Sequence, residues 1–151
     1  MFRGANKINL DAKGRLAVPT RYRARLEERC GNRVVVTVDR DYCLLIYPLP
    51  EWEEIERRLS RLPTLNRQAR RLQRLMIGHA TELELDSHGR ILLPKELREF
   101  AGMERQVMLI GQGNKFELWD EARWSERRDQ WLTEESADEA GLAAELETLS
   151  F

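Results

Sequence analysis

A chain of 151 residues with 42% hydrophobic content is about one domain with one ordinary core, and it contains no apolar run long enough to span a membrane. No basic-then-apolar leader follows Met1, so we expect a cytoplasmic protein. The formal net charge is −1, but the two halves of the chain differ in charge. Residues 1–75 carry 17 Lys and Arg against 9 Asp and Glu, whereas residues 76–151 carry 8 Lys and Arg against 17 Asp and Glu. The first half can therefore meet a polyanion, although these charges can also be no more than a solvated surface.

The chain contains one segment twice, at residues 10–19 and again at residues 85–94. Leu, Asp, Gly, Arg and Pro recur in register, so that Leu10-Asp11-Ala12-Lys13-Gly14-Arg15-Leu16-Ala17-Val18-Pro19 returns as Leu85-Asp86-Ser87-His88-Gly89-Arg90-Ile91-Leu92-Leu93-Pro94. The similarity continues, at an offset three residues shorter, as far as Trp52 and Trp124. Units of roughly 45 residues bury too little surface to be securely stable alone, so each copy should complete its core with the other in one pseudo-symmetric domain.

Each unit is predicted to run strand, tight turn, strand, short helix, two strands and an exit helix. Alternating polar and apolar residues indicate half-buried first strands at residues 7–10 and 81–85. Each following turn combines an aspartate, a glycine and an arginine: Asp11, Gly14 and Arg15 in the first unit, and Asp86, Gly89 and Arg90 in the second. The aspartate can accept hydrogen bonds from the backbone ahead of it, and the glycine can take a positive φ. The arginine starts the return strand, close enough to pair with the aspartate.

Helices and hairpins are predicted after the return strands. Pro19 and Pro94 mark helix starts, and Gly31 and Gly102 stop those helices. The β-rich runs that follow are separated by polar or glycine-rich turns, one of them at residues 111–114, and they predict two hairpin-like pairs.

Two amphipathic helices are predicted between the units, at residues 51–62 and 65–76, on either side of a break at Pro63. The predicted organisation is a first unit at residues 5–52, a helical linker at 53–80, a second unit at 81–124, and an acidic C-terminal tail at 125–151 that is helical or frayed. The apolar residues of that tail can pack within their own chain or dock on another subunit.

The opening residues Met1-Phe2-Arg3-Gly4 and the two copies of Leu-Asp-x-x-Gly-Arg followed by x-x-Pro resemble the MraZ family of AbrB/SpoVT-type swapped-hairpin barrels, over nearly the whole chain. The resemblance implies a β-rich α+β fold: a tandem swapped-hairpin β-barrel with pseudo-two-fold symmetry and flanking helices. It implies a bacterial transcription factor that binds double-stranded DNA upstream of the division and cell-wall gene cluster that it heads, represses that cluster and its own expression, and associates with the nucleoid. It also implies a ring-like homo-oligomer that engages closely spaced, G-rich boxes, with no small-molecule substrate and no cofactor.

Six basic residues are candidate DNA contacts: Arg15, Lys13, Arg3, Lys7, Arg21 and Arg90. Arg15, at the rim of a tight turn, can present its guanidinium to O6 and N7 of guanine. The two lysines, with Arg3 and Arg21, suit phosphate contacts, which position a protein without specifying sequence.

The first unit is expected to be the better polyanion binder, because Lys13 stands where the second unit has His88. The alternative for both arginines is a structural role, in which each Asp–Arg ion pair only stabilises its own hairpin. We favour DNA contact for Arg15 and the structural ion pair for Arg90, which lies in the acidic half.

Two other classes of function share features with this sequence. Paired aspartates in homologous halves also occur in the aspartic-protease dyad, but there Thr or Ser and then Gly follow each Asp, whereas Ala-Lys follows Asp11 and Ser-His follows Asp86. No phosphate loop, Ser/His/Asp set or metal cluster is present in the sequence, so no enzyme is predicted. The alternative to DNA binding is an oligomeric protein-binding scaffold, in which residues 125–151 of one chain cover residues 53–75 of the next.

The cysteines do not change this interpretation. Cys30 and Cys43 are not arranged with His79 and His88 at zinc-site spacing, so no metal is predicted. We expect both thiols to be buried and reduced.

Overall fold

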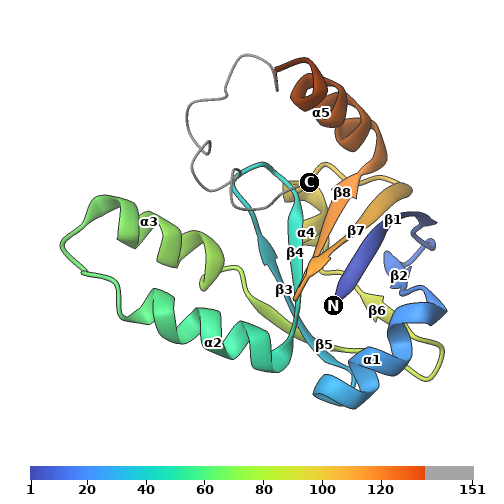
Figure 1. Ribbon diagram of the computed structural model, residues 1–151, viewed down its shortest axis with the longest axis horizontal. Helices are drawn as coiled ribbons and strands as arrows, with labels where there is room; N and C mark the ends of the chain where they lie inside the picture. Colours follow the sequence, from blue (N-terminus) through green and yellow to red (C-terminus); the bar gives the residue numbers. More distant parts are fainter. Residues whose placement is uncertain (135–151) are drawn as a thin grey trace, which may run out of the picture. The chain divides into compact units, whose positions relative to one another are not determined.

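The computed structural model describes residues 1–134, which divide into a larger unit, residues 1–121, and a smaller unit that begins at Ala122. In chain order the elements are β1 (Phe2–Asn9), β2 (Arg15–Ala17), α1 (Thr20–Cys30), β3 (Arg33–Val38), β4 (Leu44–Pro48), α2 (Leu49–Ser60), α3 (Arg67–Met76), β5 (Thr81–Glu84), β6 (Arg90–Leu92), α4 (Lys95–Phe100), β7 (Gln106–Gly113), β8 (Phe116–Asp120) and α5 (Glu121–Glu134) (Figure 1). The fold is α+β, and the predicted order of elements occurs twice, with α3 added after the first copy.

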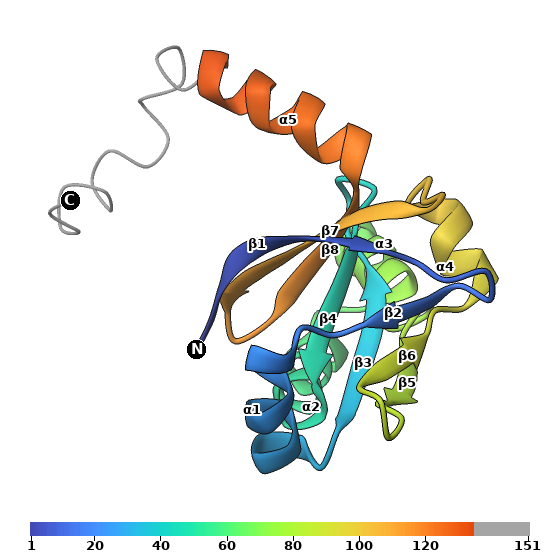
Figure 2. The same ribbon diagram turned by 90° about the vertical axis from the view of Figure 1, so that its right-hand side faces the viewer.

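The strands of the two copies exchange partners. One antiparallel sheet has the order β1-β7-β8-β4-β3-β5. In it, β1 of the first copy pairs with β7 of the second over its whole length, and β5 of the second copy pairs with β3 of the first. The two return strands, β2 and β6, pair with each other as a separate two-stranded ribbon (Figure 2). Neither copy therefore completes a sheet from its own strands.

One core cluster draws its side chains from both copies. Leu16 of β2 and Ile91 of β6 face inward and are 0% and 1% exposed. The ring of Phe116 lies with its centroid 4.3 Å from that of Phe2 and 4.9 Å from that of Tyr22. Full burial of one such apolar side chain stabilises the fold by about 1.5 to 3 kcal/mol. The expectation that each copy completes its core with the other is therefore confirmed.

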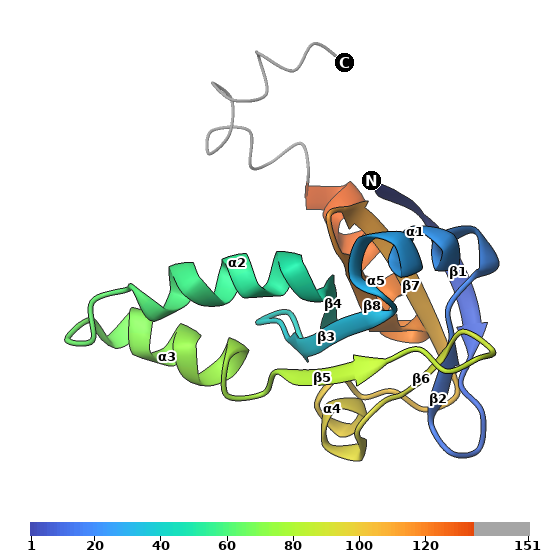
Figure 3. The ribbon, with the colours of Figure 1, turned by 90° about the horizontal axis from the view of Figure 1, so that it is seen from below.

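The two linker helices, α2 and α3, cover part of the large sheet through a second apolar cluster. In it, Trp52 and Leu59 of α2 pack with Val35 of β3 and Tyr47 of β4. Figure 3 shows α2 and α3 side by side. Asn66 caps the N-terminus of α3, because its side chain accepts hydrogen bonds from two backbone amides in the first helical turn. The helical linker was predicted from its apolar spacing, and the observed helices start within two residues of the predicted positions.

The predicted glycine-rich turn at residues 111–114 is wrong for its first three residues, which belong to β7. Gly111 and Gln112 are paired with Gly4 and Arg3 of β1, a partner that the local sequence does not reveal. A Cβ on Gly111 would lie 2.5 Å from the backbone nitrogen of Arg3, so glycine is required here by the close approach of a neighbouring strand. For the same reason β1 begins at Phe2, earlier than the predicted start at residue 7.

The smaller unit contains most of α5, in which the rings of Trp124 and Trp131 meet edge to face with centroids 5.9 Å apart. Their shared helical face was predicted. The remainder of the predicted tail, residues 135–151, lies outside the described residues. Among residues 1–134, no helix combines the length and apolar character that a membrane crossing requires. Cys30 and Cys43 are free, and burial raises the pKa of both thiols.

Candidate nucleic-acid interface

The turn between β1 and β2 is organised by Asp11. Its Oδ1 accepts hydrogen bonds from the backbone amides of Lys13, at 2.9 Å, and Arg15, at 2.8 Å. Its Oδ2 accepts a hydrogen bond from Nε of Arg15, at 2.5 Å. Gly14, with φ of +84°, donates its backbone N–H to the carbonyl oxygen of Asp11 at 3.0 Å. One carboxylate thus fixes the turn and the arginine that follows it.

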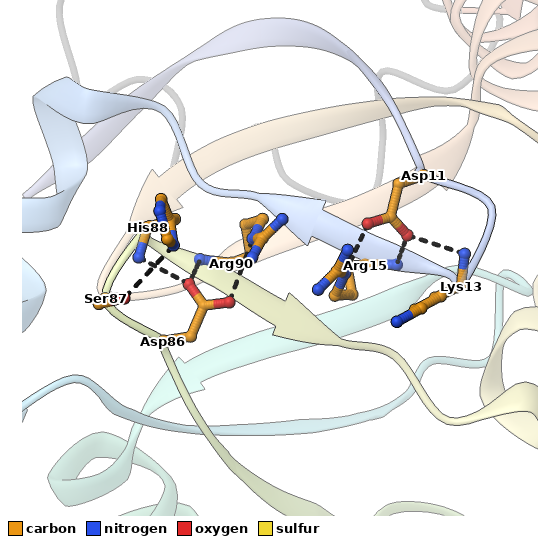
Figure 4. Close-up of polar contacts among 7 residues, drawn as sticks. All are labelled: Asp11, Lys13, Arg15, Asp86, Ser87, His88 and Arg90. Atoms are coloured by element: carbon orange, nitrogen blue, oxygen red, sulfur yellow. Dashed lines mark hydrogen bonds and ion pairs between the residues drawn. The ribbon is translucent and has the colours of Figure 1, made fainter.

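The turn between β5 and β6 has the same construction around Asp86. Its carboxylate accepts hydrogen bonds from the amides of His88, at 2.8 Å, and Arg90, at 3.0 Å, and from Nε of Arg90, at 3.1 Å (Figure 4). The side chains of Arg15 and Arg90 are 30% and 31% exposed. Within residues 1–134, neither arginine donates a hydrogen bond from its terminal nitrogens, Nη1 and Nη2. Both guanidinium groups are therefore oriented by the protein and keep free donors.

The ribbon brings the two arginines to one face. Arg15 lies opposite Leu92 and Arg90 lies opposite Ala17, whereas the intervening pair of residues faces the core. Side chains alternate between the faces of a strand, so Arg15 and Arg90 occupy diagonal positions on the outer face. Figure 4 shows the two turns at opposite ends of the ribbon, with the arginines between them. The sequence suggested different roles for the two arginines, yet the structure holds both in the same way, through a hydrogen bond from Nε to an aspartate.

Each turn is also held by the other copy. The backbone N–H of Leu93, after β6, donates to the carbonyl oxygen of Gly14 at 3.1 Å. Arg98 of α4 lies against the same glycine, so that a Cβ on Gly14 would be 2.6 Å from its Cζ. Nε of Arg98 in turn donates to the carbonyl oxygen of Leu93 at 3.2 Å. The second copy therefore supports the turn of the first.

The reciprocal contacts are made by Val18 and Arg23 of the first copy around Gly89. Val18 donates its N–H to the carbonyl oxygen of Gly89 at 2.9 Å, and Nε of Arg23 donates to the carbonyl oxygen of Val18 at 2.7 Å. Sequence reasoning missed both Arg23 and Arg98. Their separation of 75 residues equals the offset of the repeated motif, and this recurrence was the available signal.

The remaining candidates lie in the first turn, on β1 and on α1. Lys13 is exposed in the first turn and belongs to the same structure as Arg15. Lys7 of β1 forms an ion pair with Glu121 at 3.1 Å, and Arg3 is exposed on the same strand. Arg21 of α1 donates hydrogen bonds to the side chains of Asn6 and Tyr22, and its guanidinium lies over the tyrosine ring. The candidate interface is thus the ribbon with its two turns.

The electrostatics of the two aspartates differ from those of a catalytic dyad. The backbone amide of Arg15 is the main cause that holds the pKa of Asp11 below its usual range, and the amide of Arg90 does the same for Asp86. A dyad that shares one proton needs one carboxyl with a raised pKa. Both aspartates are instead suited to remain ionised and to orient an arginine.

Comparison with known proteins places this arrangement in a family. Residues 1–75 and residues 76–144 each match the family described as "MraZ protein, putative antitoxin-like". The chain belongs to the MraZ family. A relative from Halorhodospira halophila is 61% identical over 99% of both chains, one from Thioalkalivibrio sulfidiphilus is 60% identical over 99% of both, and one from Methylococcus capsulatus is 58% identical over the full length of both. Each of these relatives is named "Transcriptional regulator MraZ".

The two MraZ matches agree with the duplication in the structure. The first match covers β1 through most of α3, and the second covers β5 through α5. Each match contributes one Asp–Arg turn and one strand of the ribbon. The two MraZ repeats of one chain therefore meet in the ribbon as well as in the large sheet.

Proposed function

We propose that this chain is a sequence-specific DNA-binding transcriptional regulator that represses its own division and cell-wall gene cluster through tandem G-rich boxes. The observation that carries the proposal is the pair of arginines, Arg15 and Arg90, on one face of a two-stranded antiparallel ribbon. A ribbon of two strands fits the major groove of B-DNA, where a bidentate arginine–guanine pair discriminates by about 1 to 3 kcal/mol. The names of the full-length relatives support a role in transcription.

The orientation of the arginines supports recognition of base sequence rather than nonspecific electrostatic attraction to DNA. An arginine held through Nε loses little further side-chain entropy when its terminal nitrogens bind a base edge. Lys13, exposed beside Arg15, suits a phosphate at the edge of the groove, and His88 occupies the corresponding place in the other turn.

The swapped-hairpin barrel is proposed as the fold type, and the exchange of strands between copies supports it. A ring-like homo-oligomer is proposed because one small ribbon offers few contacts. Several ribbons in one particle raise the effective concentration of each successive contact, so tandem boxes at a matching spacing should bind well and a single box poorly. Such a protein would be cytoplasmic and associated with the nucleoid.

The test is a fluorescence-anisotropy titration of the full chain against DNA from upstream of its own gene, with scrambled boxes as a control. Arg15→Ala should weaken specific binding roughly 5- to 150-fold, the equivalent of about 1 to 3 kcal/mol. Arg90→Ala should give a similar loss because Asp86 orients Arg90 as Asp11 orients Arg15. Lys13→Ala should weaken binding to all sequences and reduce the salt slope by about 1. Arg61→Ala, at an exposed position after α2, serves as the matched control.

Equal, weak binding to every DNA by the wild type and by Arg15→Ala would contradict the proposal. Assembly that is sensitive to salt without DNA binding would then favour the protein-binding scaffold. The basic helix α3 would be its acceptor surface, since it carries four arginines and no acidic residue.

A further inference from the structure

The outer face of the ribbon carries one large apolar side chain as well as the two arginines. Four residues form this face: Arg15 opposite Leu92, and Ala17 opposite Arg90. Leu92 is 55% exposed, whereas its strand neighbour Ile91 is 1% exposed and anchors the strand in the core. A single exposed leucine is common on a protein surface. This one is fixed on a strand, directly beside an arginine that the proposed function assigns to guanine.

The position of Leu92 matches one chemical feature of DNA. Among the groups that bases present in the major groove, the 5-methyl group of thymine is the apolar one, and apolar side chains recognise it. Opposed residues in an antiparallel pair have their Cβ atoms roughly 4.5 to 5.5 Å apart. Successive bases of a strand rise by about 3.4 Å. If Arg15 binds a guanine, the side chain of Leu92 reaches the neighbouring base pair.

We infer that Leu92 contacts the 5-methyl group of a thymine adjacent to the guanine bound by Arg15. The inference rests on the proposed function and adds a specificity-determining residue to it. The corresponding position in the first copy is Ala17, whose side chain is too short to make the same contact. The two halves of the ribbon therefore read different bases, although the arginines are arranged equivalently. The ribbon therefore prefers a thymine on one side of its DNA box only, and this asymmetry fixes the direction in which the ribbon lies on the box.

The experiment begins with selection of boxes from random DNA duplexes by the full-length wild type, Leu92→Ala and Ala17→Leu. The wild-type box should contain guanines with a thymine enriched beside one of them. Leu92→Ala should keep the guanines and lose the thymine enrichment. Ala17→Leu should gain a second thymine preference at the symmetry-related position. Leu65→Ala, at a 94% exposed position between α2 and α3, is the matched control and should select the wild-type box.

A second measurement isolates the methyl group. Replacement of the selected thymine by deoxyuridine removes this methyl and keeps every hydrogen-bonding group of the base. Wild-type affinity should fall about fourfold, the factor that corresponds to one buried methyl. Leu92→Ala should bind both duplexes equally, so that the two changes are not additive.

The outcomes separate this inference from the proposed function. Equal wild-type affinity for the thymine and deoxyuridine duplexes would overturn the Leu92 contact while guanine selection kept the proposed function. Full thymine discrimination by Leu92→Ala would also overturn it. Failure of the wild type to select any guanine-containing box would refute the proposed function and, with it, this inference.

Discussion

Asp11 and Asp86 determine how their arginines are presented. Each carboxylate accepts two backbone hydrogen bonds and one from an arginine Nε, and it does so on an exposed turn. Exposed ion pairs contribute little to stability on average. The importance of these pairs is therefore geometric, since they fix a guanidinium group at the start of a strand with its terminal nitrogens still available.

Acid should weaken both turns. The pKa of Asp11 and of Asp86 is lowered in the fold, first by the amide hydrogen bonds from Arg15 and Arg90. Each carboxyl therefore binds its proton more weakly in the folded state, so its stabilising effect is complete above the ordinary aspartate pKa of about 3.9 and is lost as the pH falls through the lowered value.

The check is the urea midpoint measured between pH 7 and pH 3. A double variant, Asp11→Asn with Asp86→Asn, should be less stable than wild type at pH 7 and should lose less stability on acidification. Glu104→Gln, at an exposed position outside both turns, should behave as wild type. An acid-dependent loss of full size in the double variant would contradict this assignment.

The turn glycines should be less replaceable than another glycine with positive φ. An alanine at Gly31 meets no atom within 4 Å and pays only the left-handed backbone penalty, about 1 to 2 kcal/mol. At Gly14 the new methyl would also displace Arg98 and its hydrogen bond to Leu93, which adds about 0.5 to 1.5 kcal/mol. In urea unfolding, Gly14→Ala should therefore have a lower free energy of unfolding than Gly31→Ala. The extra cost should disappear when Gly14→Ala is combined with Arg98→Ala, and additive effects would refute the contact.

At the scale of elements, the two strand–turn–strand segments β1–β2 and β5–β6 depend on each other, because β2 pairs with β6. Each turn is supported by the short helix that follows the return strand of the opposite copy, through Arg98 of α4 for the first turn and Arg23 of α1 for the second. The first turn, which presents Arg15 for the proposed DNA contact, therefore depends on a residue of the acidic half, Arg98.

This mutual dependence predicts reciprocal effects on amide chemical shifts. Arg98→Ala should perturb the amides of Lys13 and Gly14 in the first turn more than that of Gly89. Arg23→Ala should have the opposite pattern, because it lies against Gly89. Two-dimensional NMR spectra of the two variants would measure both. Perturbations confined to the copy that carries the substitution would argue against support across the copies.

The sequence predicted the order of elements, the Asp–Gly–Arg turns and the linker helices, because each depends on contacts within a few residues. It also predicted the two hairpins β3–β4 and β7–β8. It did not predict that β1 pairs with β7 or that β2 pairs with β6, because these pairings join residues far apart in the chain. The error at Gly111 has this origin: glycine signals a turn locally, whereas here it admits a neighbouring strand. The placement of Arg15 and Arg90 on one face was not predicted for the same reason, since it follows from the β2–β6 register.

For the whole molecule, the consequence of strand exchange is mutual dependence. The first copy contributes β1, whose ladder partner is β7, and the second contributes β5, whose ladder partner is β3. The aromatic contact of Phe2 and Tyr22 with Phe116 also crosses between the copies. A small unit that loses both its partner strand and part of its core falls below the size at which a fold is comfortably stable.

We therefore expect the fragments of residues 1–75 and 76–134 to be largely unfolded when separate and to fold when mixed. In the mixture each restores the missing partner strand, so far-UV circular dichroism and a cooperative thermal transition should return only when both are present. A 76–134 fragment with Ile91→Asp should fail to complement, because it would place an unpaired charge at a core position that is 1% exposed. Leu92→Asp on the neighbouring outer face is the matched control and should still complement. A cooperative monomeric transition in the 1–75 fragment alone would show that a single copy suffices, and the exchanged strands would then be needed for the ribbon face rather than for stability.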